Sequence, residues 1–183
     1  MRIDPTAVVQ TSSIGEGTLV WQFAVILKGA VIGKNCNINC HTFIENDVVI
    51  GDNVTVKSGV YVWDGIRIAN NVFLGPCVVF TNDLRPRSKR YGEIVRTEIE
   101  EGASIGANST ILAGTRIGRY ALIGIGSVVT RDVPDHALVY GNPARINGWV
   151  DEEGDKLTNE STNIWISKAG QRYQETKKGL VRI

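Results

Sequence analysis

The sequence has few of the residues that usually bind metals or form disulfides. Its 183 residues include two histidines and three cysteines. The cysteines, Cys36, Cys40 and Cys77, show no metal-ligand spacing and cannot form an even-numbered disulfide framework. We therefore predict that the protein uses no metal and works in the cytoplasm, where thiols stay reduced.

Net charge and long apolar runs are nearly absent as well. The 20 basic and 19 acidic side chains leave a formal net charge of +1, which argues against binding nucleic acid by phosphate neutralisation. No apolar run approaches the roughly 20 residues needed to span a bilayer. The N-terminal segment MRIDPTAVVQ lacks the apolar core of a signal peptide. We therefore expect neither a nucleic-acid partner nor a membrane.

What the sequence does contain is a six-residue repeat. From Val8 to Phe80 every sixth residue is aliphatic or aromatic, and the pattern resumes at Ile99 and runs to Val129. Four positions after these residues the side chain is usually small or β-branched, as at Cys36. The period fits neither an α-helix nor a simple strand. A strict short repeat predicts a parallel β-helix, in which three repeats form one turn and residues 18 apart stack. The repeat positions, from Val8 onward, are expected to point inward and form the core.

The repeat is interrupted once and then ends. Residues 81–98 break it with a segment rich in Arg, Lys and Pro. This composition predicts a loop that leaves the β-helix, and long loops on rigid scaffolds tend to carry function. Pro134 and Pro143 mark the end of the coils. We predict an all-β chain with a β-helix domain over residues 1–150 and a small C-terminal cap over 151–183, where two similar segments favour short hairpins.

The run of hexads, the single loop and the closing VYGNPARI resemble the hexapeptide-repeat acyltransferases, which form left-handed β-helices. Within that family, the WDG segment and the FTND and PRSK segments are most similar to N-acetyltransferases of dTDP-linked 3-amino-3,6-dideoxyhexoses. A sister group acts on a UDP-linked 3-amino sugar, and both remain open here. The resemblance implies a homotrimer, acetyl-CoA as acyl donor, and a product used in O-antigen or S-layer glycan synthesis.

The 18-residue stacking gathers polar side chains at one corner, at the base of the loop. Asp64 and Asn82 share an outward column, Glu45 and Trp63 share the neighbouring one, and Asp83 falls on the next. An amine must be neutral when it attacks a thioester, and a carboxylate can orient it and accept its proton. We predict Asp64, Asn82 and Asp83, which match the family's WDG and TND motifs, as catalytic residues. Trp63 and Glu45 are predicted to bind substrate.

Two rival functions stay open. His41 is expected to point outward beside the acidic corner, and many hexapeptide acyltransferases use a histidine base on a hydroxyl, so an O-acetyltransferase with catalytic His41 is the second hypothesis. The third is a catalytically silent β-helix that serves as a binding or structural module, against which the loop and the acidic corner argue. Asn46 and Asp47 are interpreted as ordinary turn residues.

The loop and the later coils supply candidate binding residues. Arginine binds phosphate oxygens in a fork, so we predict that Arg87, with Ser88, binds the nucleotide pyrophosphate. Lys57 is expected to reach across a subunit boundary. For acetyl-CoA we expect open backbone amides for the pantetheine arm and arginines for the phosphates, at Gly106, Ala107, Gly124, Gly126, Arg131 and Arg145.

One outward column is apolar. Residues 25, 43, 61 and 79 are Val, Phe, Tyr and Val, with Trp21 and Phe23 nearby in sequence. An exposed apolar ridge of this kind favours association with a partner. It agrees with the trimer that the resemblance implies.

Overall fold

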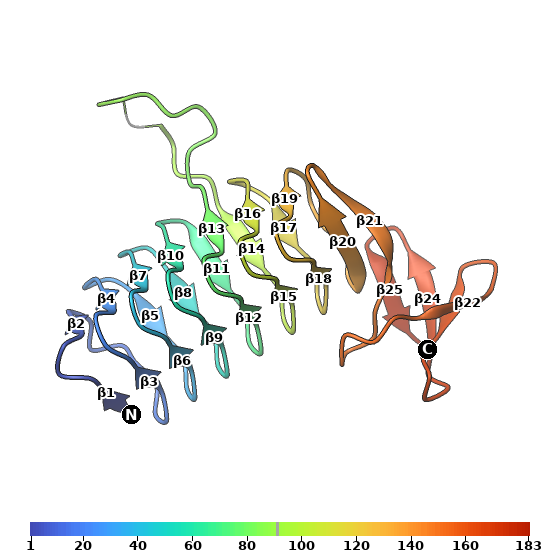
Figure 1. Cartoon of the computed structure of the whole chain (residues 1–183), viewed down its shortest axis with the longest axis horizontal. Helices are drawn as coiled ribbons and strands as arrows, with labels where there is room; N and C mark the ends of the chain where they lie inside the picture. Colours follow the sequence, from blue (N-terminus) through green and yellow to red (C-terminus); the bar gives the residue numbers. More distant parts are fainter. Residues whose placement is uncertain (91) are drawn as a thin grey trace.

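The computed structural model describes residues 1–90 and 92–183. The chain winds into a row of stacked coils that carry three parallel sheets, followed by a separate antiparallel sheet at the C-terminal end (Figure 1). This confirms the predicted β-helix and its all-β class. In the residues that the structure describes, no helix is long and apolar enough to cross a membrane.

The first sheet has nine strands, each contributed by a different coil except for the last two, which form a hairpin. Its strands in spatial order are β1 (Arg2–Ile3), β3 (Leu19–Val20), β6 (Asn37–Ile38), β9 (Thr55–Val56), β12 (Phe73–Leu74), β15 (Ser104–Ile105), β18 (Leu122–Ile123), β20 (Ala137–Gly141) and β21 (Ala144–Trp149).

The other two faces of the prism have seven and five strands. The second sheet contains β2 (Val8–Val9), β4 (Val25–Ile26), β7 (Phe43–Ile44), β10 (Tyr61–Val62), β13 (Val79–Phe80), β16 (Thr110–Ile111) and β19 (Val128–Val129). The third sheet contains β5 (Val31–Ile32), β8 (Val49–Ile50), β11 (Ile66–Ile68), β14 (Thr97–Ile99) and β17 (Arg116–Ile117).

The repeat positions form the core, as the sequence predicts. Inward aliphatic side chains such as Ile26, Ile44 and Val62 are fully buried and pair in register from coil to coil. The small residues four positions later are also buried, among them Cys36, which is 1% exposed. Burial raises the pKa of the Cys36 thiol, although hydrogen-bonding partners oppose the shift. Cys36 therefore serves as an inert core residue.

The first coil departs from the predicted pattern. Val8 was expected to point inward, but it is 52% exposed and pairs with the outward Val25, while Val9 pairs with the inward Ile26. The partners are 17 residues apart here and 18 in the following coils, because the first turn is one residue shorter. A single-residue shift moves each side chain to the opposite face of a strand.

The predicted loop leaves the prism between β13 and β14 and projects away from the coils (Figure 1). The inserted residues lengthen one coil, so Ile68 pairs with Ile99, 31 positions on, whereas Ile50 and Ile68 are 18 apart. The sheets continue in register beyond the insertion. The loop is therefore an addition to an uninterrupted scaffold.

The C-terminal sheet is antiparallel and consists of β22 (Thr158–Ser161), β23 (Ile164–Ile166), β24 (Arg172–Thr176) and β25 (Gly179–Arg182). It joins the last coil at Asp135, whose amide donates to the Lys178 carbonyl at 2.9 Å and whose carbonyl accepts from the Leu180 amide at 3.1 Å. Gly179 is required at this contact, because an added Cβ would lie 2.3 Å from the Asp135 carbonyl oxygen.

A network of ion pairs stabilises the same contact between the C-terminal sheet and the last coil. The Arg116 guanidinium donates to both carboxylate oxygens of Glu100, at 2.7 and 2.6 Å, and to Asp135 at 2.6 Å. These contacts raise the pKa of Arg116 against the opposing effect of burial. The two-pronged geometry makes this pair stronger than a typical surface ion pair.

Candidate functional site

A cleft of about 790 Å³ lies between the loop and the corner that follows the second sheet. It brings together six of the predicted site residues from three successive coils and the loop. These are Glu45, Asp64, Asn82, Asp83, Arg87 and Ser88. The cleft therefore has acidic and amide side chains at its base and cationic ones on its loop side.

Asp64 is fixed from two directions. Its backbone amide donates to Glu45 Oε2 at 2.7 Å, and its carboxylate Oδ1 accepts the backbone amide of Asp47 at 2.6 Å. Both partners come from the preceding coil, because residues one turn apart lie side by side. Asp64 is half-buried and lines the cleft. One carboxylate oxygen is thus held by the scaffold, which leaves the other for a ligand.

The start of the loop is anchored to the coils. Thr81 accepts the amide of Ala113 on its hydroxyl oxygen at 2.9 Å. Asn82 and Asp83 follow directly and are half-buried in the cleft wall. Asp83 Oδ1 accepts the Arg85 amide at 2.7 Å, a local turn contact that sets the direction in which the loop departs.

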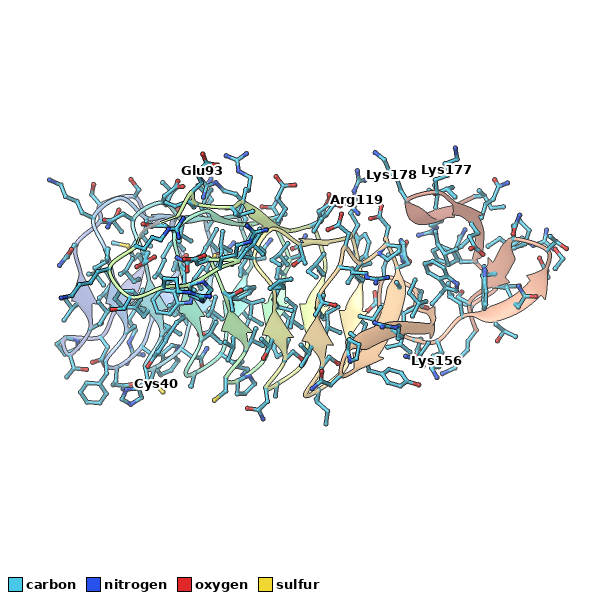
Figure 2. The ribbon with its side chains drawn as sticks, turned by 90° about the horizontal axis from the view of Figure 1, so that it is seen from above. Cys40, Glu93, Arg119, Lys156, Lys177 and Lys178 are labelled. Atoms are coloured by element: carbon cyan, nitrogen blue, oxygen red, sulfur yellow. The ribbon has the colours of Figure 1, made fainter. Side chains whose placement is uncertain are left out.

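The returning half of the loop packs against the corner. Gly65 has a φ of +87°, and a Cβ there would lie 2.5 Å from Ile94 Cγ2, so only glycine fits under the loop at this point. Arg90, one of the basic loop residues whose charge suits a pyrophosphate, also lines the cleft, and so do Ile94 and Glu93, which were not predicted. Figure 2 shows Glu93 on the outer edge of the molecule. No repeat relates these residues to others, so the sequence offered no signal for them beyond their place in the loop.

His41 does not line this cleft, contrary to the prediction that it lies beside the acidic corner. It occupies the turn before β7, with a φ of +57°, and its exposed ring stacks on Phe23 at 5.2 Å. Cys40, its neighbour in the chain, lies on the opposite side of the prism from Glu93 in Figure 2. The cause is geometric, because strand β7 separates His41 from Glu45. Within one chain, His41 and Asp64 therefore occupy different corners.

Lys57 also lies away from the cleft. It directly follows β9 of the first sheet, and its backbone amide donates to the Leu74 carbonyl at 3.0 Å. The first sheet is not the face beside the cleft. A role for Lys57 at this site would therefore require a second chain.

The apolar ridge is present on the second sheet. Val25, Phe43, Tyr61 and Val79 pair in one outward row. Phe43, Tyr61 and Trp63 form a cluster of aromatic contacts with ring centroids 5.7 to 6.2 Å apart. With His41 at one edge they line a groove of about 400 Å³. Trp63, predicted to bind substrate, thus lines this groove and is absent from the lining of the acidic cleft, although it directly precedes Asp64 in the chain.

The backbone amides expected to bind pantetheine are mostly engaged within the coils. The amide of Gly106 donates to Ile123, that of Gly124 to Val139 and that of Gly126 to Ala107, at 2.8 to 2.9 Å. The prediction of open amides is therefore wrong for these three glycines. The reason is that the parallel ladder between coils uses the same donors. Of the four residues predicted to offer an amide, only Ala107 remains a predicted donor to the pantetheine arm.

The two predicted arginines of the later coils do come together. Arg131 and Arg145 line one cleft of about 360 Å³, between the turn after β19 and the hairpin of β20 and β21. Both side chains are exposed. Asp132 also lines this cleft, so its two arginines leave it a net positive charge, which suits a phosphate-bearing group.

Comparison with known proteins agrees with this architecture. The family described as "Bacterial transferase hexapeptide (six repeats)" matches residues 11–46, 47–82 and 96–131, and this repeat makes the coil a left-handed β-helix. The dTDP-3-amino-3,6-dideoxy-alpha-D-galactopyranose 3-N-acetyltransferase of Aneurinibacillus thermoaerophilus is 58% identical over 173 residues, 94% of this chain and 90% of that protein.

Two solved structures share the fold at low identity. The polySia-specific acetyltransferase NeuO matches with a TM-score of 0.58 and 24% identity, over 72% of this chain and 66% of that one. The UDP-N-acetylglucosamine acyltransferase LpxA of Bacteroides fragilis matches with a TM-score of 0.55 and 18% identity, over 80% and 74%. With the family match and the 58% identical relative, the chain belongs to the bacterial hexapeptide transferases and is an acetyltransferase.

Proposed function

We propose that this protein transfers an acetyl group from acetyl-CoA to the 3-amino group of a dTDP-linked 3-amino-3,6-dideoxyhexose. The observation that carries the proposal is the composition of one cleft, in which Asp64, Asn82 and Asp83 face the cationic loop residues Arg87 and Arg90. An amino sugar carries an amine at one end and a diphosphate at the other. The cleft offers a complementary group to each.

Asp64 is the residue best placed to receive the amine. A carboxylate accepts hydrogen bonds from an amino group, orients its lone pair and takes up its proton as the new amide bond forms. Bound acetyl-CoA supplies the acetyl group: its thioester C–S bond breaks as the amide C–N bond forms, and CoA leaves as the thiol after it takes up the proton. Asn82, next in the stack, has a side-chain NH₂ that can donate to an oxygen on which negative charge develops. Asp83 is the alternative proton acceptor.

The ends of the two substrates have separate candidate sites. Arg87 and Ser88 in the loop are proposed to bind the nucleotide diphosphate, because guanidinium and hydroxyl groups donate to phosphate oxygens. Arg131 and Arg145 are proposed to bind the phosphates of CoA in their own cleft. The 58% identical relative from A. thermoaerophilus is a transferase of a dTDP-linked 3-amino sugar, which supports this class of acceptor. On this proposal, the acetylated product enters surface-glycan synthesis and the enzyme is cytoplasmic.

The active form is proposed to be a homotrimer. The apolar row on the second sheet includes Tyr61 and Val79, each 49% exposed, and Phe23, which lines the groove beside it, is 55% exposed. Apolar area of this extent favours a partner, and the acidic cleft lies at the edge of the same face. Light scattering after size-exclusion chromatography tests the trimer. Tyr61→Glu is expected to yield monomers with lower activity, whereas an unchanged mass in that variant would place the interface elsewhere.

Thiol release from acetyl-CoA, measured over a panel of dTDP- and UDP-linked 3-amino sugars, tests the function. We expect turnover with a dTDP-3-amino-3,6-dideoxyhexose and little with the 3-hydroxy analogue. Turnover with a UDP-linked sugar alone would transfer the proposal to the sister substrate class. Turnover of hydroxyl acceptors alone would overturn N-acetylation and make His41 the residue to study.

A further inference from the structure

Arg67 lies behind the cleft, at the middle of β11 on the third sheet. Its side chain is 24% exposed and donates to Asp47 twice, from Nη1 to the carbonyl oxygen and from Nη2 to Oδ1, both at 2.5 Å. Arg67 and Asp47 are absent from the residues that line the cleft. The guanidinium therefore binds both the main chain and the side chain of Asp47.

Asp47 passes this constraint on to Asp64. Its backbone amide donates to Asp64 Oδ1 at 2.6 Å, and its carbonyl also accepts the Gly65 amide at 3.0 Å. The chain of contacts thus runs from Arg67 through Asp47 to the Asp64 carboxylate. The Asp47 carboxylate is 55% exposed, so without Arg67 this turn has little else to fix its side chain.

We propose that Arg67 is a positioning residue for acetyl transfer. By clamping Asp47 at two points, it orients the amide that holds Asp64 Oδ1 and so directs the second carboxylate oxygen toward the acceptor amine. The proposal rests on the proposed function of Asp64. A planar guanidinium can make both contacts at once, whereas a lysine ammonium cannot reproduce this fork.

Steady-state kinetics of Arg67→Met and Arg67→Lys test the proposal. We expect kcat to fall about 10- to 100-fold in both variants, because a misplaced catalytic group costs rate rather than binding, with KM for both substrates little changed. Combined with Asp64→Asn, Arg67→Met should lower kcat no further, because the two residues act as one unit. Arg116→Met is the matched control. It removes an arginine from β17 of the same sheet, and its effect should multiply with that of Asp64→Asn.

A second measurement does not depend on activity. In the wild type the Asp47 amide is hydrogen-bonded, so its hydrogen exchange should be slow; Arg67→Met should accelerate it, and Arg116→Met should not. If exchange accelerates but no amino sugar is acetylated by the wild type, the clamp exists and the proposed function fails. If Arg67→Met keeps wild-type kcat, or if its effect multiplies with that of Asp64→Asn, Arg67 is only a structural residue and the proposal is overturned.

Discussion

The indole N–H of Trp63 donates to the backbone carbonyl of Phe80 at 2.9 Å. In the two preceding coils the corresponding carbonyls, of Ile44 and Val62, accept backbone amides from Leu27 and Glu45. A side chain therefore replaces a backbone donor at the point where the loop leaves the prism. The Trp63 indole thus satisfies the buried carbonyl of Phe80 without a backbone donor, and the chain can turn outward two residues before Asn82.

Trp63→Phe should destabilise this point and impair the site. The phenyl ring keeps the apolar contacts with Phe43 and Tyr61 but removes the donor, and an unpaired buried carbonyl costs about 1–3 kcal/mol. Because Asn82 follows closely, we expect kcat/KM to fall about tenfold or more. Thermal unfolding and steady-state kinetics measure the two effects.

Trp21→Phe is the matched control for this change. The Trp21 indole donates to Asn37 Oδ1 at 2.6 Å, an exposed contact far from the loop. Water can replace the lost partner there, so we expect a small change in stability and unchanged kcat/KM. Equal losses in the two variants would mean that the Trp63 hydrogen bond has no special role at the loop.

Asp64→Asn and His41→Asn should separate the two acetyltransferase mechanisms. Asn keeps the size of Asp64 but cannot accept a proton, so kcat should fall about 10²- to 10⁴-fold. His41→Asn should leave kcat unchanged, because His41 stacks on Phe23 outside the cleft. A large loss in His41→Asn with a small one in Asp64→Asn would favour transfer to a hydroxyl.

The coils could be predicted from the sequence because their periodicity and their packing have the same origin. A buried side chain at each repeat position, such as Ile44 or Val62, leaves a mark in the sequence at a fixed spacing. The same spacing placed Glu45, Asp64 and Asn82 together, because residues 18 apart occupy adjacent coils. Stacking is thus enough to find a site that is built on the scaffold.

Other contacts leave no periodic pattern in the sequence and could not be predicted from it. Hydrogen bonds within the ladder decide which amides are open, so Gly106 appeared available in the sequence and is not. Strand β7 separates His41 from Glu45, although only three residues lie between them in the chain. Arg67 reaches Asp47 across a corner, a contact that depends on side-chain direction rather than on period. Glu93 lines the cleft because of the course of the loop, and the loop has no sequence repeat from which that course could be predicted.

Leu74→Ala and Phe73→Ala test the alternation of the strands directly. Leu74 is fully buried, so its truncation should cost about 2–5 kcal/mol of unfolding free energy. Phe73 precedes it on β12 and is 39% exposed, so the same truncation should cost much less. Urea unfolding followed by circular dichroism gives both values. A reversed order would contradict the register of the first sheet.

The C-terminal sheet should lose stability at both ends of the pH range. The Tyr173 hydroxyl donates to Glu152. Burial raises the pKa of Tyr173 above its usual 10.0, and the contact with Glu152 adds to the shift. Burial would raise the pKa of Glu152 too, but the hydrogen bond from Tyr173 and nearby positive charge outweigh it, so that pKa lies below its usual 4.5.

The signs of the two pKa shifts predict that stability falls at both ends of the pH range, along an acid limb and an alkaline limb of the curve of stability against pH. A lowered carboxyl pKa stabilises the folded state above pH 4.5, and this contribution is lost as the pH falls below that value. A raised tyrosine pKa favours the neutral hydroxyl in the folded state, so stability is lost as the pH rises beyond 10.0. Trp149 and Trp165 pack with ring centroids 6.3 Å apart in this region, so tryptophan fluorescence can follow its unfolding.

Tyr173→Phe isolates this pair from the buried His136, whose ring also contacts Tyr173 with centroids 5.3 Å apart. The variant keeps the aromatic ring but loses the hydroxyl. The alkaline limb should disappear, since its titrating group is gone. The acid limb should become shallower, since Glu152 loses the donor that lowers its pKa. An alkaline limb that persists in Tyr173→Phe would show that another group controls how the C-terminal sheet is held against the last coil.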